Sequence, residues 1–185
     1  MALGDSFTAG FGLPRDEAFP AKLEHALKAK GYNVTINNAG VSGDTTSGGL
    51  ARVDWSVPEG SDAVILELGG NDALRGIDPK ITRTALEAIL RRLRDRRIPV
   101  LLCGMLAPPN YGVEFRNAFE GIFPALAKTY DPVFYPFFLE GVAADRQLNQ
   151  ADGLHPNAAG VAVIVDHIRP KAEELIARVK AQRGS

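Results

Sequence analysis

The sequence has almost no cysteine, no long hydrophobic run and no excess of charge of either sign. Because Cys103 is the only cysteine, an intramolecular disulfide and a cysteine-rich metal cluster are excluded. No apolar stretch approaches the roughly 18 residues of a membrane span, so we expect no stable membrane insertion. The 21 Lys and Arg residues against 22 Asp and Glu residues leave a net charge of -1, which favours no binding to nucleic acid.

The amino terminus lacks the pattern of a secretory signal. No charged segment followed by an apolar core precedes the first glycine-rich loop, which begins at Gly4 and leaves only residues 1–3 for a strand. We therefore expect a cytoplasmic location for the chain as given, and a periplasmic or secreted one if a leader was removed. The sequence indicates no particular oligomeric state.

The composition is that of a folded domain, and the pattern of hydrophobic residues predicts an α/β fold. The 185 residues are 45% hydrophobic, which predicts one domain over residues 1–185. Short apolar runs alternate with helical patterns, as in a parallel sheet with helices on both faces. We expect strands at 1–4, 33–38, 63–68, 99–104 and 132–135, and helices at 18–30, 80–96, 114–129 and 158–182. Pro124 should bend or split the third helix, and Pro170 should kink or restart the last.

Polar or glycine-rich segments follow the predicted strands. In an open α/β sheet, ligands bind outside the carboxyl ends of the strands, so these segments should meet at one edge. They are residues 4–10, 40–44, 69–72, 105–112 and, before the last helix, 152–156.

This edge contains the residue types of an acyl-transfer site. Ser6 lies at a tight strand-to-helix turn, where its hydroxyl can act as a nucleophile. His155 is the one histidine of three at this edge, since His25 and His167 fall within predicted helices. Asp152 precedes His155 by three residues and can orient the imidazole. We therefore predict Ser6, His155 and Asp152 as nucleophile, base and orienting acid.

The same edge offers hydrogen-bond donors for a developing oxyanion. Candidate donors are the backbone N–H groups of Ser6 and Gly43 and the side-chain amide of Asn71. Asp5 is expected to brace the loop that carries Ser6. Glu67, a carboxylate inside an apolar strand, is expected to be a buried hydrogen-bond partner.

At these residues the chain resembles the SGNH (GDSL-type) hydrolases, in particular the bacterial thioesterase, lysophospholipase and arylesterase subgroup. The four blocks that name the family occur in order as Gly4-Asp5-Ser6, Gly43, Gly69-Gly70-Asn71-Asp72 and Asp152-x-x-His155. One departure is Phe7, where the family usually has Leu.

The resemblance implies a three-layer α/β/α, flavodoxin-like fold with five parallel strands in the order 2-1-3-4-5. It also implies hydrolysis of small to medium acyl esters or thioesters through an acyl-enzyme, without a cofactor or metal. By the same resemblance the 108–113 loop lines the acyl-binding groove. Candidate substrate-binding residues are Asp5, Asn110, Tyr111 and Leu154.

Two other functions fit parts of the pattern. A flavodoxin-like module could bind a phosphate or cofactor through the Ser-, Thr- and Gly-rich segment 6–12. That segment has no P-loop Lys and no G-x-G-x-x-G, and such a module leaves the Asp152 and His155 pair unexplained. An acyltransferase would use the same three catalytic residues and differ only in its acceptor.

Overall fold

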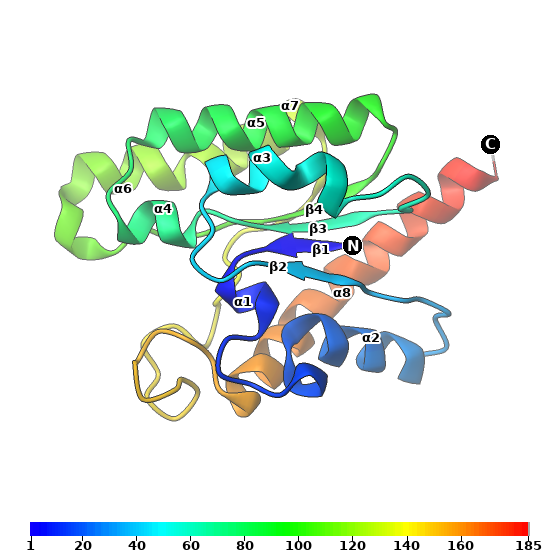
Figure 1. Cartoon of the computed structure of the whole chain (residues 1–185), viewed down its shortest axis with the longest axis horizontal. Coiled ribbons are helices and arrows are strands. Elements are labelled where there is room, and N and C mark those ends of the chain that lie inside the picture. The colour runs from blue at the N-terminus through cyan, green and yellow to red at the C-terminus, as the bar shows by residue number, and fades with distance from the viewer. Residues whose placement is uncertain (185) are drawn as a thin grey trace.

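A five-stranded parallel sheet forms the centre of the structure, a computed structural model that describes residues 1–184 (Figure 1). The strands lie in the order β2-β1-β3-β4-β5, which confirms the expected order 2-1-3-4-5. In the register, Leu3 lies opposite Ala39 on one side and Leu66 on the other. The strands are β1 (Ala2–Gly4), β2 (Asn38–Gly40), β3 (Val64–Glu67), β4 (Val100–Cys103) and β5 (Val133–Tyr135).

Helices cover both faces of the sheet, so the fold has three layers. Figure 1 shows α3, α5 and α7 on one face, and α2 and α8 on the other. The α-helices are α1 (Ser6–Ala9), α2 (Phe19–Ala29), α3 (Thr46–Ser56), α4 (Gly70–Leu74), α5 (Pro79–Asp95), α6 (Gly112–Glu120), α7 (Ile122–Tyr130) and α8 (Ala158–Arg183). Two short 3-10 helices, η1 (Arg15–Glu17) and η2 (Pro109–Tyr111), complete the elements.

The expected helices at 18–30 and 80–96 are confirmed as α2 and α5. In α5 the side chain of Asp78 accepts a hydrogen bond from Lys80 N–H at 2.9 Å and so caps the first turn. One face of α5 is buried against the sheet, as the spacing of Leu86, Ile89 and Leu93 predicts.

The predicted strand at 33–38 is wrong in position, because β2 spans Asn38–Gly40. β1 offers only Ala2–Gly4 for pairing, and its partners begin at Asn38. Upstream, Ile36 N–H donates to Glu24 of α2 at 2.6 Å instead of joining the sheet. Val34 and Ile36 therefore pack on the core ahead of the strand, and the first hydrogen bond to β1 is the one that the Asn37 carbonyl accepts from Ala2 N–H at 2.9 Å.

The predicted helix at 114–129 is divided, as expected from Pro124. α6 ends at Glu120, and α7 begins at Ile122, which places Pro124 in the first turn of α7. The first N–H groups of a helix have no partner within it, so a proline costs no hydrogen bond there.

Pro170 does not restart the last helix, since α8 runs without interruption from Ala158 to Arg183. Pro170 has no N–H to donate to the carbonyl of Asp166, four residues earlier. Both residues are exposed, so water can satisfy that carbonyl.

A continuous cluster of buried apolar side chains extends from Leu3 to Leu175 and includes both faces of the sheet. Cys103 belongs to it as a free thiol, and burial, with the nearby Glu67 carboxylate, raises the pKa of Cys103 well above its usual value. Within residues 1–184 no helix has both the length and the apolar character needed to cross a bilayer. That residues 1–185 make one domain stays a prediction, and Ser185 lies outside the described residues.

Candidate active site

The turn between β1 and α1 presents Ser6 at the carboxyl edge of the sheet. Asp5 caps α1 by accepting a hydrogen bond from Phe7 N–H at 3.0 Å, and α1 ends after one turn at Gly10, which has a φ of 80°. Gly4 allows this tight packing, because a Cβ there would collide with the side chains of Thr8 and Glu67. Ser6 is therefore held at the start of a short helix in a closely packed turn.

The segment before α8 brings His155 and Asp152 to Ser6. One oxygen of Asp152 accepts hydrogen bonds from the backbone N–H groups of Leu154 at 2.9 Å and His155 at 3.0 Å. Its other oxygen lies 2.6 Å from His155 Nδ1, and His155 Nε2 lies 2.9 Å from Ser6 Oγ. The sequence-predicted residues Ser6, His155 and Asp152 thus form one hydrogen-bonded series.

The electrostatics of this series favour one imidazole tautomer. Hydrogen bonds from the backbone and then the side chain of His155 lower the pKa of Asp152 to about 2. Asp152 is therefore a carboxylate at neutral pH and accepts a hydrogen bond from the N–H at His155 Nδ1. Nε2 is then left to accept a hydrogen bond from the Ser6 hydroxyl, the arrangement that general-base catalysis requires.

The His155 ring is fixed by aromatic packing and by a glutamine that the sequence did not indicate. The rings of Phe11 and Phe7 lie 4.6 and 5.5 Å from the imidazole, centroid to centroid. Gln150 Nε2 donates to the carbonyls of Phe11 at 2.7 Å and Pro156 at 3.0 Å. Gln150 thereby ties the His155 segment to the loop after α1. Its role depends on a contact between residues 139 positions apart, which no local pattern reveals.

The three candidate oxyanion donors line a common pocket of about 160 Å³. In the described part of the chain, the N–H groups of Ser6 and Gly43 have no protein acceptor. The Asn71 amide donates one hydrogen to Asp5 at 3.0 Å and keeps a second for another acceptor. The pocket is lined by Ser6, Phe7, Phe11, Ser42, Gly43, Gly70, Asn71, Leu74, Leu154 and His155.

Two buried carboxyl groups lie beneath the Ser6 turn. Glu67 accepts hydrogen bonds from Thr8 Oγ1 at 2.7 Å and Asp5 N–H at 3.3 Å, while its other oxygen has no hydrogen-bond partner within residues 1–184. Burial, and then the neighbouring Asp5, raises the pKa of Glu67 well above its usual range. Burial also raises the pKa of Asp5 to about 6. Glu67 is thus a buried hydrogen-bond partner, as the sequence predicts.

The four candidate substrate-binding residues lie in different places. Leu154 lines the pocket, whereas Asp5 is fully buried beneath it. Asn110 and Tyr111 are exposed in η2, outside the residues that line the pocket. Tyr111 reaches the pocket indirectly, since its hydroxyl donates to the carbonyl of Leu74 at 2.8 Å. Phe11, Leu74 and Ser42 line the pocket but were not predicted from the sequence; the exposed Phe11 in a glycine-rich loop was the available signal.

Larger hollows lie at the opposite edge of the sheet, where the strands begin. Their volumes are about 630 and 660 Å³, and none of the candidate catalytic or oxyanion residues lines either of them. Among residues 1–184 no group of three or more His, Cys, Asp or Glu side chains is placed to hold a metal ion.

Comparisons with known proteins identify relatives over nearly the whole chain. The profile of the GDSL-like Lipase/Acylhydrolase family matches residues 2–163. The chain is 37% identical to "Esterase TesA" of Pseudomonas aeruginosa over 177 residues, which cover 95% of this chain and 88% of the relative. It is 36% identical to "Arylesterase" of Vibrio mimicus over 183 residues, or 98% of this chain and 86% of the relative.

Solved structures have the same fold as this chain. The crystal structure of TesA superposes with a TM-score of 0.89 at 37% identity and covers 94% of this chain and 97% of its own. AlinE4, described as an SGNH-hydrolase family esterase, gives a TM-score of 0.79 at 48% identity, with 94% and 93% of the two chains covered.

Proposed function

The chain belongs to the GDSL-like lipase/acylhydrolase family and is a carboxylic ester hydrolase, and from this premise we propose that Ser6, His155 and Asp152 carry out its chemistry. The observation that carries the proposal is the series of hydrogen bonds from Ser6 Oγ through the imidazole to Asp152, at 2.9 and 2.6 Å. A phosphate-binding module is not supported, because the relatives of the chain are esterases and thioesterases.

In the acylation half-reaction, Ser6 Oγ attacks the ester carbonyl carbon while His155 Nε2 takes the hydroxyl proton. The imidazolium is stabilised by Asp152, which is ionised at neutral pH because its pKa is lowered to about 2. His155 then returns the proton to the leaving alkoxide or thiolate, which gives the acyl-enzyme and the free alcohol or thiol. In deacylation, water takes the place of Ser6 as nucleophile, and His155 again accepts and returns a proton.

The negative charge that develops on the carbonyl oxygen needs donors already in place. The residues that carry these donors, Ser6, Gly43 and Asn71, line the pocket. Among residues 1–184, the N–H groups of Ser6 and Gly43 and the second Asn71 amide hydrogen have no protein acceptor that would compete. Each donor of this kind contributes about 10²–10³ in rate. We therefore assign the three groups to the oxyanion hole.

The pocket supports short to medium acyl groups as substrates. Its volume of about 160 Å³ is below the roughly 300–1,000 Å³ of sites that enclose drug-sized ligands. Apolar side chains of Phe11, Leu74 and Leu154 line it and suit an alkyl chain. We propose small acyl esters, including aryl and acetyl esters, as the preferred class, with thioesters and lysophospholipids as further candidates.

The test compares the wild type with Ser6→Ala on p-nitrophenyl esters from acetate to decanoate. We expect Ser6→Ala to lose at least about 10³-fold in kcat and to escape covalent labelling by a fluorophosphonate. Ser47→Ala, which removes an exposed hydroxyl from α3, should behave as the wild type. Ester hydrolysis that survives in Ser6→Ala would overturn the proposed nucleophile. With added methanol, the ratio of methyl ester to free acid distinguishes transfer from hydrolysis, since an acyltransferase gives the methyl ester as the main product.

A further inference from the structure

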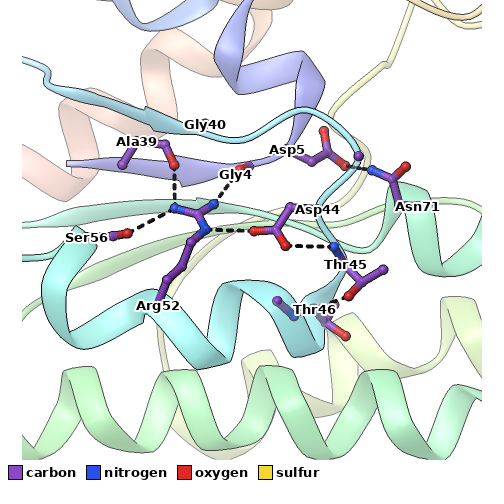
Figure 2. A network of polar contacts seen from close by, with 12 residues as sticks. Gly4, Asp5, Ala39, Gly40, Asp44, Thr45, Thr46, Arg52, Ser56 and Asn71 are labelled. Atoms are coloured by element: carbon purple, nitrogen blue, oxygen red, sulfur yellow. Dashed lines mark hydrogen bonds and ion pairs between the residues drawn. The ribbon is translucent and has the colours of Figure 1, made fainter.

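Arg52 of α3 is buried and bonds to three separate segments near the site (Figure 2). Its Nε donates to Asp44 at 2.7 Å, and its Nη2 donates to the carbonyl of Gly4 at 2.8 Å. Its Nη1 donates to the carbonyl of Ala39 at 2.8 Å and to Ser56 Oγ at 3.1 Å. The guanidinium thus connects the ends of β1 and β2 with the loop that leads into α3.

A buried guanidinium with a single carboxylate partner is costly unless its N–H groups are satisfied. Arg52 is 7% exposed, and its guanidinium donates four hydrogen bonds, each to a different residue. The planar guanidinium directs donors from three nitrogens to acceptors around its edge, whereas the three donors of a lysine ammonium radiate from a single nitrogen. The geometry therefore depends on an arginine and not on a positive charge alone.

The acceptors of Arg52 stand next to two of the assigned oxyanion donors. Asp44 directly follows Gly43, and Gly4 is two residues before Ser6. Gly43 has a φ of 80°, and its carbonyl accepts a hydrogen bond from Arg75 Nη2 at 2.8 Å on the exposed side. In the same turn, Asp44 N–H donates to the carbonyl of Val41 at 3.1 Å, and Val41 N–H donates to the carbonyl of Gly4 at 3.0 Å. The ion pair between Arg52 and Asp44 adds a buried side-chain contact to this turn, at the residue that directly follows Gly43.

The third oxyanion donor, Asn71, is joined to the same network through its neighbour Asp72 and through Asp5. Asp72, which follows Asn71, accepts hydrogen bonds from Thr46 N–H at 2.9 Å and Thr46 Oγ1 at 2.6 Å. Asp5 accepts from the Asn71 amide, as Figure 2 also shows. The loops that carry the three donors are therefore held together by buried side chains, and Arg52 is the cation among them.

We propose that Arg52 is a positioning residue for the oxyanion hole, which it orders by holding Asp44 beside Gly43 and the Gly4 carbonyl beside the Ser6 turn. This inference rests on the proposed function. Arg52 does not line the pocket, so its removal should affect the transition state more than the binding of the ester. A displacement of about 1 Å in such a site can cost 10²-fold in rate.

The test uses Arg52→Lys, which keeps the charge and loses the fork. We expect kcat for p-nitrophenyl acetate to fall about 10- to 100-fold and KM to change less than about threefold. The affinity for an alkyl boronic acid, which forms a tetrahedral anionic adduct with Ser6, should fall by the same factor as kcat. A purely structural role would lower the melting temperature without this parallel loss.

Arg92→Lys is the matched control, because Arg92 also bonds to α3, at Asp54 and Leu50, but on the exposed surface. It should retain the wild-type kcat and boronic acid affinity.

Two further variants decide the matter if Arg52→Lys does not fold. Asp44→Asn removes the charge partner, and Gly48→Ala places a Cβ against Asp44 Oδ1 and displaces its carboxylate. Both should show the paired loss of kcat and boronic acid affinity. Suppose that Arg52→Lys folds and keeps the wild-type kcat and boronic acid affinity, or that it does not fold and the other two variants keep them. If Ser6→Ala is inactive in the same assays, the proposed role of Arg52 is wrong and the proposed function stands. If Ser6→Ala keeps its activity, the proposed function itself fails.

Discussion

Asp5 uses both of its carboxylate oxygens as acceptors, one for the N–H of Phe7 and one for the amide of Asn71, each at 3.0 Å. A carboxylate can accept on both oxygens, whereas an asparagine side chain has one acceptor and one donor group. The charge of Asp5 therefore matters less to the site than its capacity to accept twice. That capacity sets which hydrogen of Asn71 points into the pocket.

At the residue scale, Asp5→Asn should lower kcat by about tenfold with little change in KM. The new amide would face either Phe7 N–H or the Asn71 amide, and in each case two donors oppose one another, so an oxyanion donor is disturbed. Steady-state kinetics on p-nitrophenyl acetate measures the effect. Asp16→Asn, an exposed change in η1, serves as the control. Wild-type kcat in folded Asp5→Asn would show that the Asn71 amide needs no such anchor.

At the scale of elements, η2 acts on the pocket through one side chain. The Tyr111 ring packs against Gly76, where φ is 61° and a Cβ would lie 2.8 Å from the ring. Its hydroxyl donates to the carbonyl of Leu74, and Leu74 lines the pocket. The position of the segment after α4 is therefore set by an element that comes much later in the sequence.

Tyr111→Phe should raise the ratio of kcat/KM for p-nitrophenyl octanoate to that for acetate by about two- to fivefold. Loss of a hydrogen bond of roughly 1 kcal/mol loosens the Leu74 segment and allows longer acyl chains to enter. Tyr130→Phe, which removes a hydroxyl bonded to Glu87 at 3.1 Å, is the matched control. If Tyr111→Phe leaves the octanoate-to-acetate ratio of kcat/KM unchanged, η2 has no part in selecting the length of the acyl chain.

The elements also show where sequence reasoning succeeds. Buried strands such as β3 and β4 and the amphipathic α5 have strong local patterns and were predicted. α3 was missed because it opens with Thr46-Ser47-Gly48-Gly49, residues of low helix propensity, and is stabilised by the Thr45 cap and by Arg52.

The candidate site was likewise predictable where local motifs carry it, and not where it depends on contacts between distant residues. Residues within short strand-end motifs were found, and the structure brings Ser6, Asp152 and His155 together. Arg52 and Gln150 were not found, because their partners are distant in the sequence.

At the scale of the whole molecule, two buried carboxyl groups affect the free energy of unfolding. Burial raises the pKa of Asp5 to about 6 and that of Glu67 well above its usual range. A raised pKa means that the folded state holds its proton more tightly than the unfolded chain does. This contribution to stability is complete below the unfolded-state pKa values near 4 and is lost as the pH rises through 6 and above.

Glu67→Gln should therefore flatten the pH dependence of stability. We expect its melting temperature at pH 8 to exceed that of the wild type by about 3 °C, the shift that roughly 1 kcal/mol produces in a chain of this size. Towards pH 4 the difference should shrink, because the folded Glu67 is protonated there and the unfolded one becomes protonated as the pH falls through its pKa near 4. Thermal unfolding from pH 4 to 9 measures this, with the exposed Glu59→Gln as control. Parallel wild-type and Glu67→Gln curves would contradict it.

The hydrogen bond between Ser6 and His155 joins residues 149 positions apart. During synthesis on the ribosome, Ser6 is therefore made long before the base that activates it. At about 5–20 residues per second the interval is roughly 7 to 30 s. Throughout that time the nascent chain carries Ser6 without the imidazole of His155 to take its proton. The enzyme is therefore inactive when its synthesis begins, and hydrolysis can start only after His155 has been made and has folded against Ser6.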